Sequence, residues 1–234
     1  MAQVAVVTGA ARNLGRTIAL GLAAAGYHVV VNTRTSRGEA EQVVEQAERL
    51  GVRAVAVEAD VSDEAAVAEM FRTAASLGVL RVLVNNAALR TPGTMHDLSL
   101  SDWRAVQSVV LDGSFLCIRE ALPLMLAGGG GHIVNILGGH AMSGDPGRVH
   151  VSAAKHGLAG LSVAVATAHA REGITANAVS PVGMRADSAE TLEARRERVS
   201  DVVCFLASEA AGAVTGQVVE VDCSHVHRNP GGVG

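Results

Sequence analysis

Short apolar runs alternate along this chain with longer amphipathic segments, and that alternation restricts the fold more than any other feature of the sequence. The short runs have the length of strands, whereas the longer segments place apolar residues such as Val67, Phe71 and Ala74 on one face of a helix. Strands that alternate with helices are typical of βαβ units, whose parallel sheet is covered by helices on both faces. The sequence therefore predicts an α/β fold with one doubly wound parallel sheet of about seven strands.

The expected elements follow one another without a linker, a repeat or a low-complexity segment, so we expect a single domain over residues 1–234. We expect strands near residues 3–8, 28–32, 53–58, 80–84, 132–137, 174–179 and 217–221. We expect helices near residues 14–25, 38–50, 63–77, 101–126, 152–171 and 195–207. Ser62 and Ser101 are the expected N-caps of two helices, and Gly26 and Gly51 are expected helix stops.

Composition argues against several classes of function. The 234 residues are 49% hydrophobic, which is enough to form a core without disulfides or a structural metal. The net charge is −4, and the sequence has no block of basic residues of the kind that binds nucleic acid. The cysteines Cys117, Cys204 and Cys223 lack paired spacing, which favours a reducing cytoplasm. No apolar run approaches the roughly 18 residues of a membrane span, and the first residues show no basic leader. We expect a cytoplasmic protein without nucleic-acid or membrane partners.

The first expected strand ends in a glycine-rich turn that opens directly onto a helix. The turn reads Thr8-Gly9-Ala10-Ala11-Arg12-Asn13-Leu14-Gly15. Backbone amides and the helix dipole at such a turn can hold a pyrophosphate, as in Rossmann-type folds. Asn13 stands where the usual fingerprint has glycine, and asparagine is the side chain that best tolerates a left-handed backbone. We therefore expect Gly9, Arg12, Asn13, Leu14 and Gly15 to contact a dinucleotide.

The second expected strand indicates which dinucleotide is bound. It ends Val31-Asn32-Thr33-Arg34, without the Asp or Glu that would accept hydrogen bonds from a free ribose 2′-hydroxyl. Arg12 and Arg34 can instead pair with a 2′-phosphate, which favours NADP(H), with NAD(H) as the alternative. A second interpretation is that both arginines are solvated surface residues.

With these motifs, the chain resembles the short-chain dehydrogenase/reductase family over nearly its whole length. The segments that carry the resemblance are Thr8-Gly9 to Gly15, Asp60-Val61, Asn85-Asn86-Ala87 and Ser152-Ala153-Ala154-Lys155. The segments Gly131–Ile136 and Val202–Ser208 look closest to the ketoacyl-carrier-protein reductase branch. The resemblance implies that Asp60 and Val61 flank the adenine and that Asn86 and Ala87 line the ribose. It also implies that Pro181 lies beside the nicotinamide.

The resemblance further implies a catalytic set of tyrosine, lysine, serine and asparagine, of which only the lysine, Lys155, remains. Val151 stands four residues before Lys155, at the tyrosine position, and Gly138 and Val110 stand at the serine and asparagine positions. The only tyrosine, Tyr27, lies in the second βα unit, so no shift of register restores the pattern. Losing a positioned general acid slows a reaction by about 10²- to 10⁴-fold. We therefore expect that the family's ordinary ketoreduction is not available.

Three residues are candidates for the remaining chemistry. Lys155 is the only lysine among 19 basic residues, which indicates that a compact ammonium is needed there; the alternative is an exposed helix lysine. His140 and His150 fall in the segment that faces substrate in the family, and histidine titrates near pH 6.5. The alternative is that both are solvated loop residues.

The C-terminal half departs further from the family. Val182 separates Pro181 from Gly183, which are adjacent in the family. We expect a shortened substrate lid near residues 184–200 and a flexible tail near residues 224–234. Cys223, His225 and His227 offer zinc-ligand types, but three ligands without a fourth do not define a site, so we expect no metal.

Three functional hypotheses remain open. The first is a divergent enzyme that binds NADP(H) and acts on a small metabolite by non-standard oxidoreduction; the arginine-over-lysine composition is typical of GC-rich genomes and hints at specialised metabolism. The second is a non-redox cyclase, dehydratase or lyase that uses histidine acid/base chemistry. The third is a non-catalytic partner subunit or cofactor sensor. The resemblance implies a homodimer or homotetramer in each case.

Overall fold

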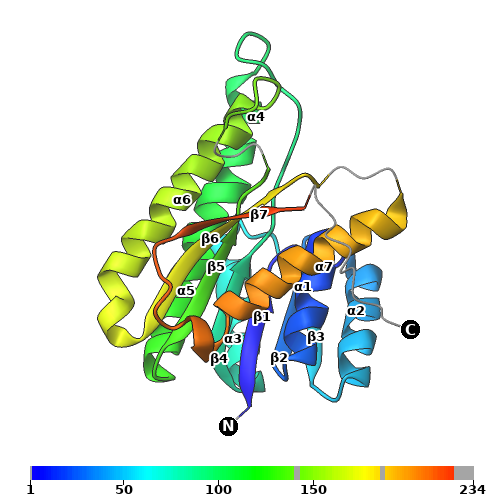
Figure 1. Ribbon diagram of the computed structural model, residues 1–234, viewed down its shortest axis with the longest axis vertical. Helices are drawn as coiled ribbons and strands as arrows, with labels where there is room; N and C mark the ends of the chain where they lie inside the picture. Colours follow the sequence, from blue (N-terminus) through cyan, green and yellow to red (C-terminus); the bar gives the residue numbers. More distant parts are fainter. Residues whose placement is uncertain (1, 140–142, 185–187, 224–234) are drawn as a thin grey trace, which may run out of the picture.

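Helices cover both faces of a seven-stranded parallel sheet in the computed structural model, which describes residues 2–139, 143–184 and 188–223 (Figure 1). Within these residues the strands lie in the order β3-β2-β1-β4-β5-β6-β7, and every neighbouring pair is parallel. The strands are β1 (Gln3–Val7), β2 (His28–Thr33), β3 (Ala54–Glu58), β4 (Val79–Asn85), β5 (Gly131–Ile136), β6 (Ile174–Val182) and β7 (Val218–Asp222). The predicted fold class, a single-domain doubly wound Rossmann-type sheet, is confirmed.

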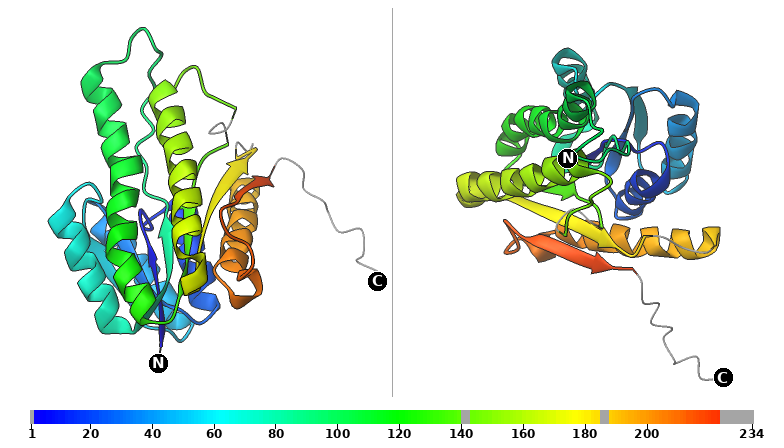
Figure 2. Two further views of the ribbon diagram at one scale, coloured as in Figure 1. Left: turned by 90° about the vertical axis from the view of Figure 1, so that its left-hand side faces the viewer. Right: turned by 90° about the horizontal axis from the view of Figure 1, so that it is seen from above.

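The longer helices divide between the two faces. Helices α1, α2 and α7 pack on one face, and α3, α5 and α6 pack on the other. Their bounds, with that of α4, are α1 (Asn13–Ala24), α2 (Arg37–Arg49), α3 (Glu64–Leu77), α4 (Leu100–Gln107), α5 (Gly113–Ala127), α6 (Val149–His169) and α7 (Ala189–Leu206). Two short 3₁₀ segments, η2 (Ala170–Glu172) and η3 (Glu209–Ala211), follow α6 and α7. Helices α5 and α6 run side by side along the outer surface (Figure 2).

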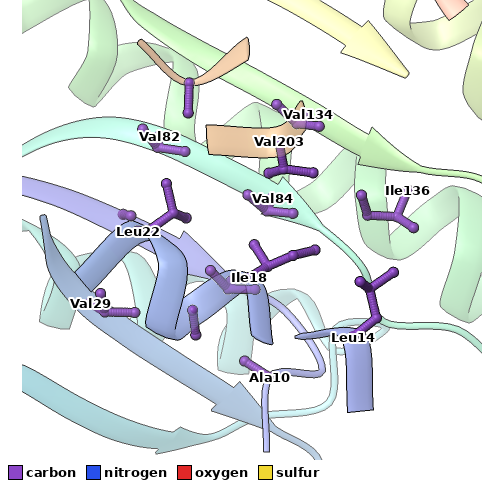
Figure 3. Close-up of a cluster of buried hydrophobic side chains, with 14 of the residues drawn as sticks. Ala10, Leu14, Ile18, Leu22, Val29, Val82, Val84, Val134, Ile136 and Val203 are labelled. Atoms are coloured by element: carbon purple, nitrogen blue, oxygen red, sulfur yellow. The ribbon is translucent and has the colours of Figure 1, made fainter. Parts of the chain in front are cut away.

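The buried residues of β1 explain why its sequence is apolar at successive positions. Ala5 and Val7 contact the layer of α1, α2 and α7, whereas Val4 and Val6 contact the layer of α3, α5 and α6. Side chains alternate between the two faces of a strand, and both faces of this sheet are covered, so every position must be apolar. Figure 3 shows the first layer, in which Ile18 and Leu22 of α1 lie against the sheet.

Helix ends follow the predicted chemistry but not always the predicted residue. Gly26 and Gly51 lie just beyond α1 and α2 with φ of +92° and +88°, which confirms both as helix stops. The predicted N-cap Ser62 is wrong, because the Asp63 carboxylate accepts hydrogen bonds from the backbone amides of Ala65 and Ala66. The hydroxyl of Ser62 instead donates to Asp60. A carboxylate one residue nearer the helix thus satisfies the amides that Ser62 was expected to bind.

Ser99, rather than the predicted Ser101, caps α4 by accepting a hydrogen bond from the Asp102 amide. The single helix expected near residues 101–126 is also interrupted, because the π-helical turn η1 (Ser108–Asp112) separates α4 from α5. The Ser114 hydroxyl donates to the Val110 carbonyl oxygen across this turn. Apolar spacing alone did not indicate the interruption, since a π turn adds one residue without changing the composition of the helix.

The cap of α3 can be tested directly. Replacing Asp63 by alanine leaves two first-turn amides without their acceptor, so we expect the free energy of unfolding to fall by about 1 kcal/mol. Urea denaturation monitored by circular dichroism measures the change. Ser62→Ala is the matched control and should lose much less, whereas Asp63→Asn keeps an acceptor oxygen and should retain most of the stability. Equal losses in the Asp63→Ala and Ser62→Ala variants would contradict this assignment.

Candidate functional site

A cavity of about 380 Å³ lies at the carboxyl ends of β1, β2, β3 and β4. The chain runs from β1 outward to β2 and β3 and then returns to place β4 on the other side of β1, so the strand order reverses at this point. Open α/β sheets bind ligands where the order reverses. The cavity is lined by Gly9, Ala11–Gly15, Asn32–Ser36, Ala59–Val61, Asn86–Arg90 and Val109.

The glycine-rich turn has the backbone that its sequence indicates. Gly9 has a φ of +61°, and Asn13 has a φ of +52°, the only positive value for a non-glycine residue in the described part of the chain. A Cβ atom at Gly15 would overlap the Gly9 carbonyl oxygen and the side-chain nitrogen of Asn86. Residue 15 must therefore be glycine for the turn to close, and the asparagine at position 13 supplies the left-handed residue in place of a second glycine.

The first turn of α1 is suited to an anion. Arg12 is its N-cap residue and makes no side-chain cap hydrogen bond, and the first turn carries no acidic residue. The amides of a helix N-terminus lack intrahelical acceptors and carry the positive end of the helix dipole. Since Asn13, Leu14 and Gly15 also line the cavity, this turn fits the pyrophosphate of a dinucleotide.

Two asparagines brace the turn from opposite sides. Asn32, at the end of β2, accepts a hydrogen bond from the Gly9 amide at 3.2 Å and donates to the Ala59 carbonyl oxygen at 3.0 Å. Asn86 donates to the carbonyl oxygens of Thr8 and Gly9 at 2.9 and 3.0 Å. These hydrogen bonds of Asn32 were not predicted from the sequence, although a polar residue directly after the buried run Val29–Val31 is a signal for such a role.

The two predicted arginines border the cavity near the end of β2. Arg12 and Arg34 both line it, and Arg12 pairs with Glu39 at 3.8 Å across an exposed surface. Burial raises the pKa of Asp60, but hydrogen bonds from Ser62 and the charge of Arg34 outweigh it, so the pKa is lowered. The remaining predicted contacts Val61 and Ala87 line the cavity as well, whereas Pro181 and Lys155 do not.

The positions of the expected catalytic set are occupied by one apolar cluster. Val110 is fully buried in the π turn η1 and packs with Leu137, Ala154 and Leu158, and Val151 on α6 packs against the same cluster. A Cβ atom at Gly138 would meet no atom of the described residues within 4 Å, so these residues leave space beside the strand end. No hydroxyl or amide stands at these three positions, and the apolar cluster packs α6 against the π turn.

Lys155 lies beneath this cluster rather than at the surface of the cavity. It is 2% exposed, and its Nζ atom donates to the Ile136 carbonyl oxygen at 2.5 Å. The interpretation of Lys155 as an exposed helix lysine is therefore wrong. Burial, followed by the nearby charge of Arg90, lowers the pKa of its ammonium from 10.5 to about 7. At this pKa the charged and neutral forms of the Lys155 side chain are of similar free energy near neutral pH.

His150 is fully buried, so its interpretation as a solvated loop residue is wrong. Its Nε2 atom lies 3.2 Å from the Thr91 hydroxyl, and Nδ1 has no hydrogen-bond partner among the described residues. The side chain of Gln107 donates to its backbone oxygen at 3.0 Å. His150 thus joins α6 to the loop after β4, and its ring does not line the cavity. His140 lies outside the described residues.

The C-terminal half contributes less to the site. Gly183 has a φ of +70°, and α7 begins at Ala189, six residues before the helix expected near 195–207. Residues 185–187 of the predicted lid and 224–234 of the predicted tail, with His225 and His227, lie outside the described residues. In the described ranges no three His, Cys, Asp or Glu side chains gather as a metal site. None of the described helices is long and apolar enough to cross a membrane.

Comparison with known proteins finds relatives of closely similar length. Residues 3–197 match the family described as short chain dehydrogenase. A 3-oxoacyl-[acyl-carrier-protein] reductase of Synechocystis sp. is 38% identical over 94% of this chain and 96% of its own. Cis-4-hydroxycyclohexanecarboxylate dehydrogenase of Sinomonas cyclohexanicum is 38% identical over 94% of this chain and 95% of its own. The crystal structure of acetoin dehydrogenase from Enterobacter cloacae matches with a TM-score of 0.89 at 31% identity, covering 100% of this chain and 99% of that one.

The buried ammonium of Lys155 gives the stability of the fold a pH dependence of definite sign. Its pKa is 10.5 in the unfolded reference and about 7 in the fold. Between these values the unfolded chain binds more protons, so stability rises with pH, by at most about 1.4 kcal/mol per pH unit. Replacing Lys155 by methionine removes the titrating group and keeps most of the side-chain volume. We therefore expect the free energy of unfolding of the wild type to rise relative to that of Lys155→Met between about pH 7 and pH 9.

Urea denaturation of both proteins at several pH values measures this difference. Subtraction cancels the groups that the two proteins share, such as Cys117, whose thiol pKa is raised to about 12 by burial. A difference that does not change with pH would mean that Lys155 keeps an ordinary pKa in the folded protein.

Proposed function

This chain belongs to the short-chain dehydrogenase family, and we propose that it is a divergent member that binds NADP(H) and acts on a small metabolite by a non-standard oxidoreduction. The observation that carries the proposal is a contrast between the cavity and the positions of the expected catalytic set. The cavity keeps a glycine turn, a helix N-terminus and two arginines, whereas Val110, Gly138 and Val151 occupy the expected proton-transfer positions. We further propose that the chemistry belongs to specialised metabolism.

The chain's own residues support the binding of a nicotinamide dinucleotide. The first turn of α1 offers amides to the pyrophosphate, and the bracing of Gly9 by Asn32 and Asn86 keeps the turn open to it. Arg12 and Arg34 suit a 2′-phosphate, and the carboxylate that would favour a free 2′-hydroxyl is absent from the end of β2. When bound, the cofactor supplies or accepts a hydride. NAD(H) is the alternative cofactor.

The proton that accompanies a hydride must come from a group other than the family's tyrosine. Lys155 is the residue we assign to this role, because its pKa of about 7 suits proton exchange near neutral pH. Its acceptor, the Ile136 carbonyl oxygen, precedes the open space at Gly138 by two residues. His150 and His140 are the other candidates, but the ring of His150 is directed to Thr91. That direction disfavours His150 as the acid or base of a cyclase, dehydratase or lyase.

A second function is favoured by a specific observation. Lys155 and His150 are both buried and neither lines the cavity, so the described residues present no proton-transferring side chain at the family's tyrosine position. A protein that binds the cofactor without turning it over, as a partner subunit or a cofactor sensor, needs no such group. Tight binding of NADPH without oxidation of NADPH by any ketone would support this function over the first.

We also propose that the protein forms a homodimer or homotetramer through its long helices. The side chains of Phe115 on α5 and Val163 on α6 are 48% and 47% exposed, and association through these helices would bury both of them. Sedimentation analysis of the purified protein tests this assembly.

The preference for NADP(H) depends on Arg34. We expect Arg34→Gln to weaken NADPH binding by about 10- to 100-fold, because it removes a charge-assisted hydrogen bond to the 2′-phosphate. Binding of NADH, which lacks this phosphate, should be unchanged. Isothermal calorimetry measures both affinities. Arg37→Gln is the matched control, because Arg37 is exposed, pairs with Glu41 and does not line the cavity. Equal losses for NADPH and NADH would contradict the phosphate assignment.

The replaced positions can be restored. We expect the Gly138→Ser/Val151→Tyr variant to oxidise NADPH with a 3-oxoacyl thioester at least 100-fold faster than the wild type, because a positioned acid and an oxyanion donor return beside Lys155. The open space at Gly138 accommodates a serine side chain. The absorbance of NADPH measures the rate.

Gly138→Ser/Val151→Phe is the matched control for restoration, since it adds the ring without the hydroxyl and should stay as slow as the wild type. If the wild type already reduces this thioester as fast as the restored variant, its chemistry does not depend on the replaced positions and the proposed non-standard mechanism is wrong.

A further inference from the structure

Arg90, in the loop after β4, brings a third guanidinium to the cavity on the side away from Arg34. Arg34 follows β2 and Arg90 follows β4, and these two strands flank β1 on opposite sides. The neighbouring residue Leu89 packs against the apolar cluster that contains Val110 and Val151. Arg90 therefore lines the end of the cavity that adjoins the replaced positions, where a reacting molecule would lie, rather than the end that suits a 2′-phosphate.

The charges around Arg90 are not balanced. No carboxylate in the described part of the chain forms an ion pair with Arg90, and Asp145, at 4.0 Å, pairs with the neighbouring cation Arg148. Much of Arg90 is accessible to solvent, yet partial loss of solvent around its guanidinium, followed by the charge of Arg148, lowers its pKa. Arg90 in turn lowers the pKa of Lys155. Like charges held this close cost free energy that a bound anion would offset.

The surface beside Arg90 is apolar. Leu89 and Val109 line the same end of the cavity, and neither offers a hydrogen bond from its side chain. A molecule held here is recognised by one charge-assisted contact to the guanidinium and by apolar contact with its body. A guanidinium binds planar carboxylates and phosphates through two parallel N–H donors, which a neutral carbonyl or hydroxyl cannot match.

We propose that Arg90 determines specificity by binding an anionic oxygen group, a carboxylate or a phosphate, on the small metabolite that reacts in this cavity. The proposal rests on the proposed function of the cavity as a cofactor and substrate site, and it names the substrate class. Binding of the anion offsets the charge of Arg90, which has no carboxylate partner among the described residues. It also places the rest of the metabolite between Leu89 and Val109, against the apolar cluster.

Binding of three ring compounds of similar size tests the proposal. Benzoate carries the carboxylate, phenyl phosphate the phosphate, and benzamide is the neutral match for benzoate. Affinities are measured by titration calorimetry on the wild type, Arg90→Gln and Arg49→Gln, each with and without saturating NADPH. Arg49 is an exposed arginine at the end of α2 that does not line the cavity, so its variant is the matched control.

We expect the wild type to bind benzoate or phenyl phosphate at least about tenfold more tightly than benzamide. Arg90→Gln should lose this preference and keep its affinity for NADPH, and Arg49→Gln should behave as the wild type. The tighter of the two anions identifies the group. Equal binding of benzoate, phenyl phosphate and benzamide, or no binding of any of them, would overturn the proposal.

A loss of NADPH affinity in Arg90→Gln with the anion preference intact would also overturn it, since the guanidinium would then hold the pyrophosphate of the cofactor. The cofactor proposal fails separately. Wild type that does not bind NADPH, but still prefers the anion over benzamide in an Arg90-dependent way, would remove the cofactor function and leave the anion site in place.

Discussion

The closed turn after β1 is the constraint on which the rest of the site depends. Gly15 must lack a Cβ atom because the Gly9 carbonyl oxygen and the Asn86 side chain occupy that space. Asn32 belongs to β2 and Asn86 to the loop after β4, so the turn is hydrogen-bonded to both halves of the sheet. The place where the strand order reverses is therefore also the place where the backbone is most tightly specified, and the α1 N-terminus points into the cavity as a result.

The two halves of the cleft have diverged in opposite ways. On the β1 and β2 side the polar groups that suit a dinucleotide remain, whereas Val110 and Val151, from the π turn and α6, pack into one cluster. Replacing several polar groups of the catalytic set together destabilises the fold less than replacing one of them alone. A buried hydroxyl or amide that has lost its hydrogen-bond partner destabilises the folded state by about 1–3 kcal/mol. His150, whose Nδ1 atom has no hydrogen-bond partner among the described residues, precedes Val151 on α6 and joins this helix to the loop after β4.

Sequence reasoning predicted the fold well because its signals are local and repeated. The ends of six strands lie within one residue of their expected positions, since a buried parallel strand is a continuous apolar run bounded by polar or glycine residues; β6 instead continues to Val182, three residues beyond the expected end. The caps of α3 and α4 were predicted one or two residues away from the true ones, because the choice between neighbouring cap residues such as Ser62 and Asp63 depends on backbone geometry. The π turn was not predicted because it leaves no mark on the apolar spacing. The burial of Lys155 and His150 could not be predicted either, because it depends on how α6 packs against loops distant in sequence.

The retention of Lys155 has no explanation in packing. A buried ammonium loses its hydration and here gains one carbonyl acceptor and a neighbouring cation, so at neutral pH it destabilises the fold relative to an apolar residue of similar volume. Apart from Lys155, all residues counted as Lys or Arg in this chain are arginines, so composition does not account for a lysine at this position. With Val151 in place of a tyrosine, Lys155 has no phenol to tune. Besides the proton transfer proposed for it, Lys155 supplies an ammonium that an anion at Arg90 would stabilise, because a negative charge there opposes the repulsion from Arg90, which adds to burial in lowering the pKa of Lys155. Arg90 and the apolar residues Leu89 and Val109 then form one proposed binding site for an amphipathic anion.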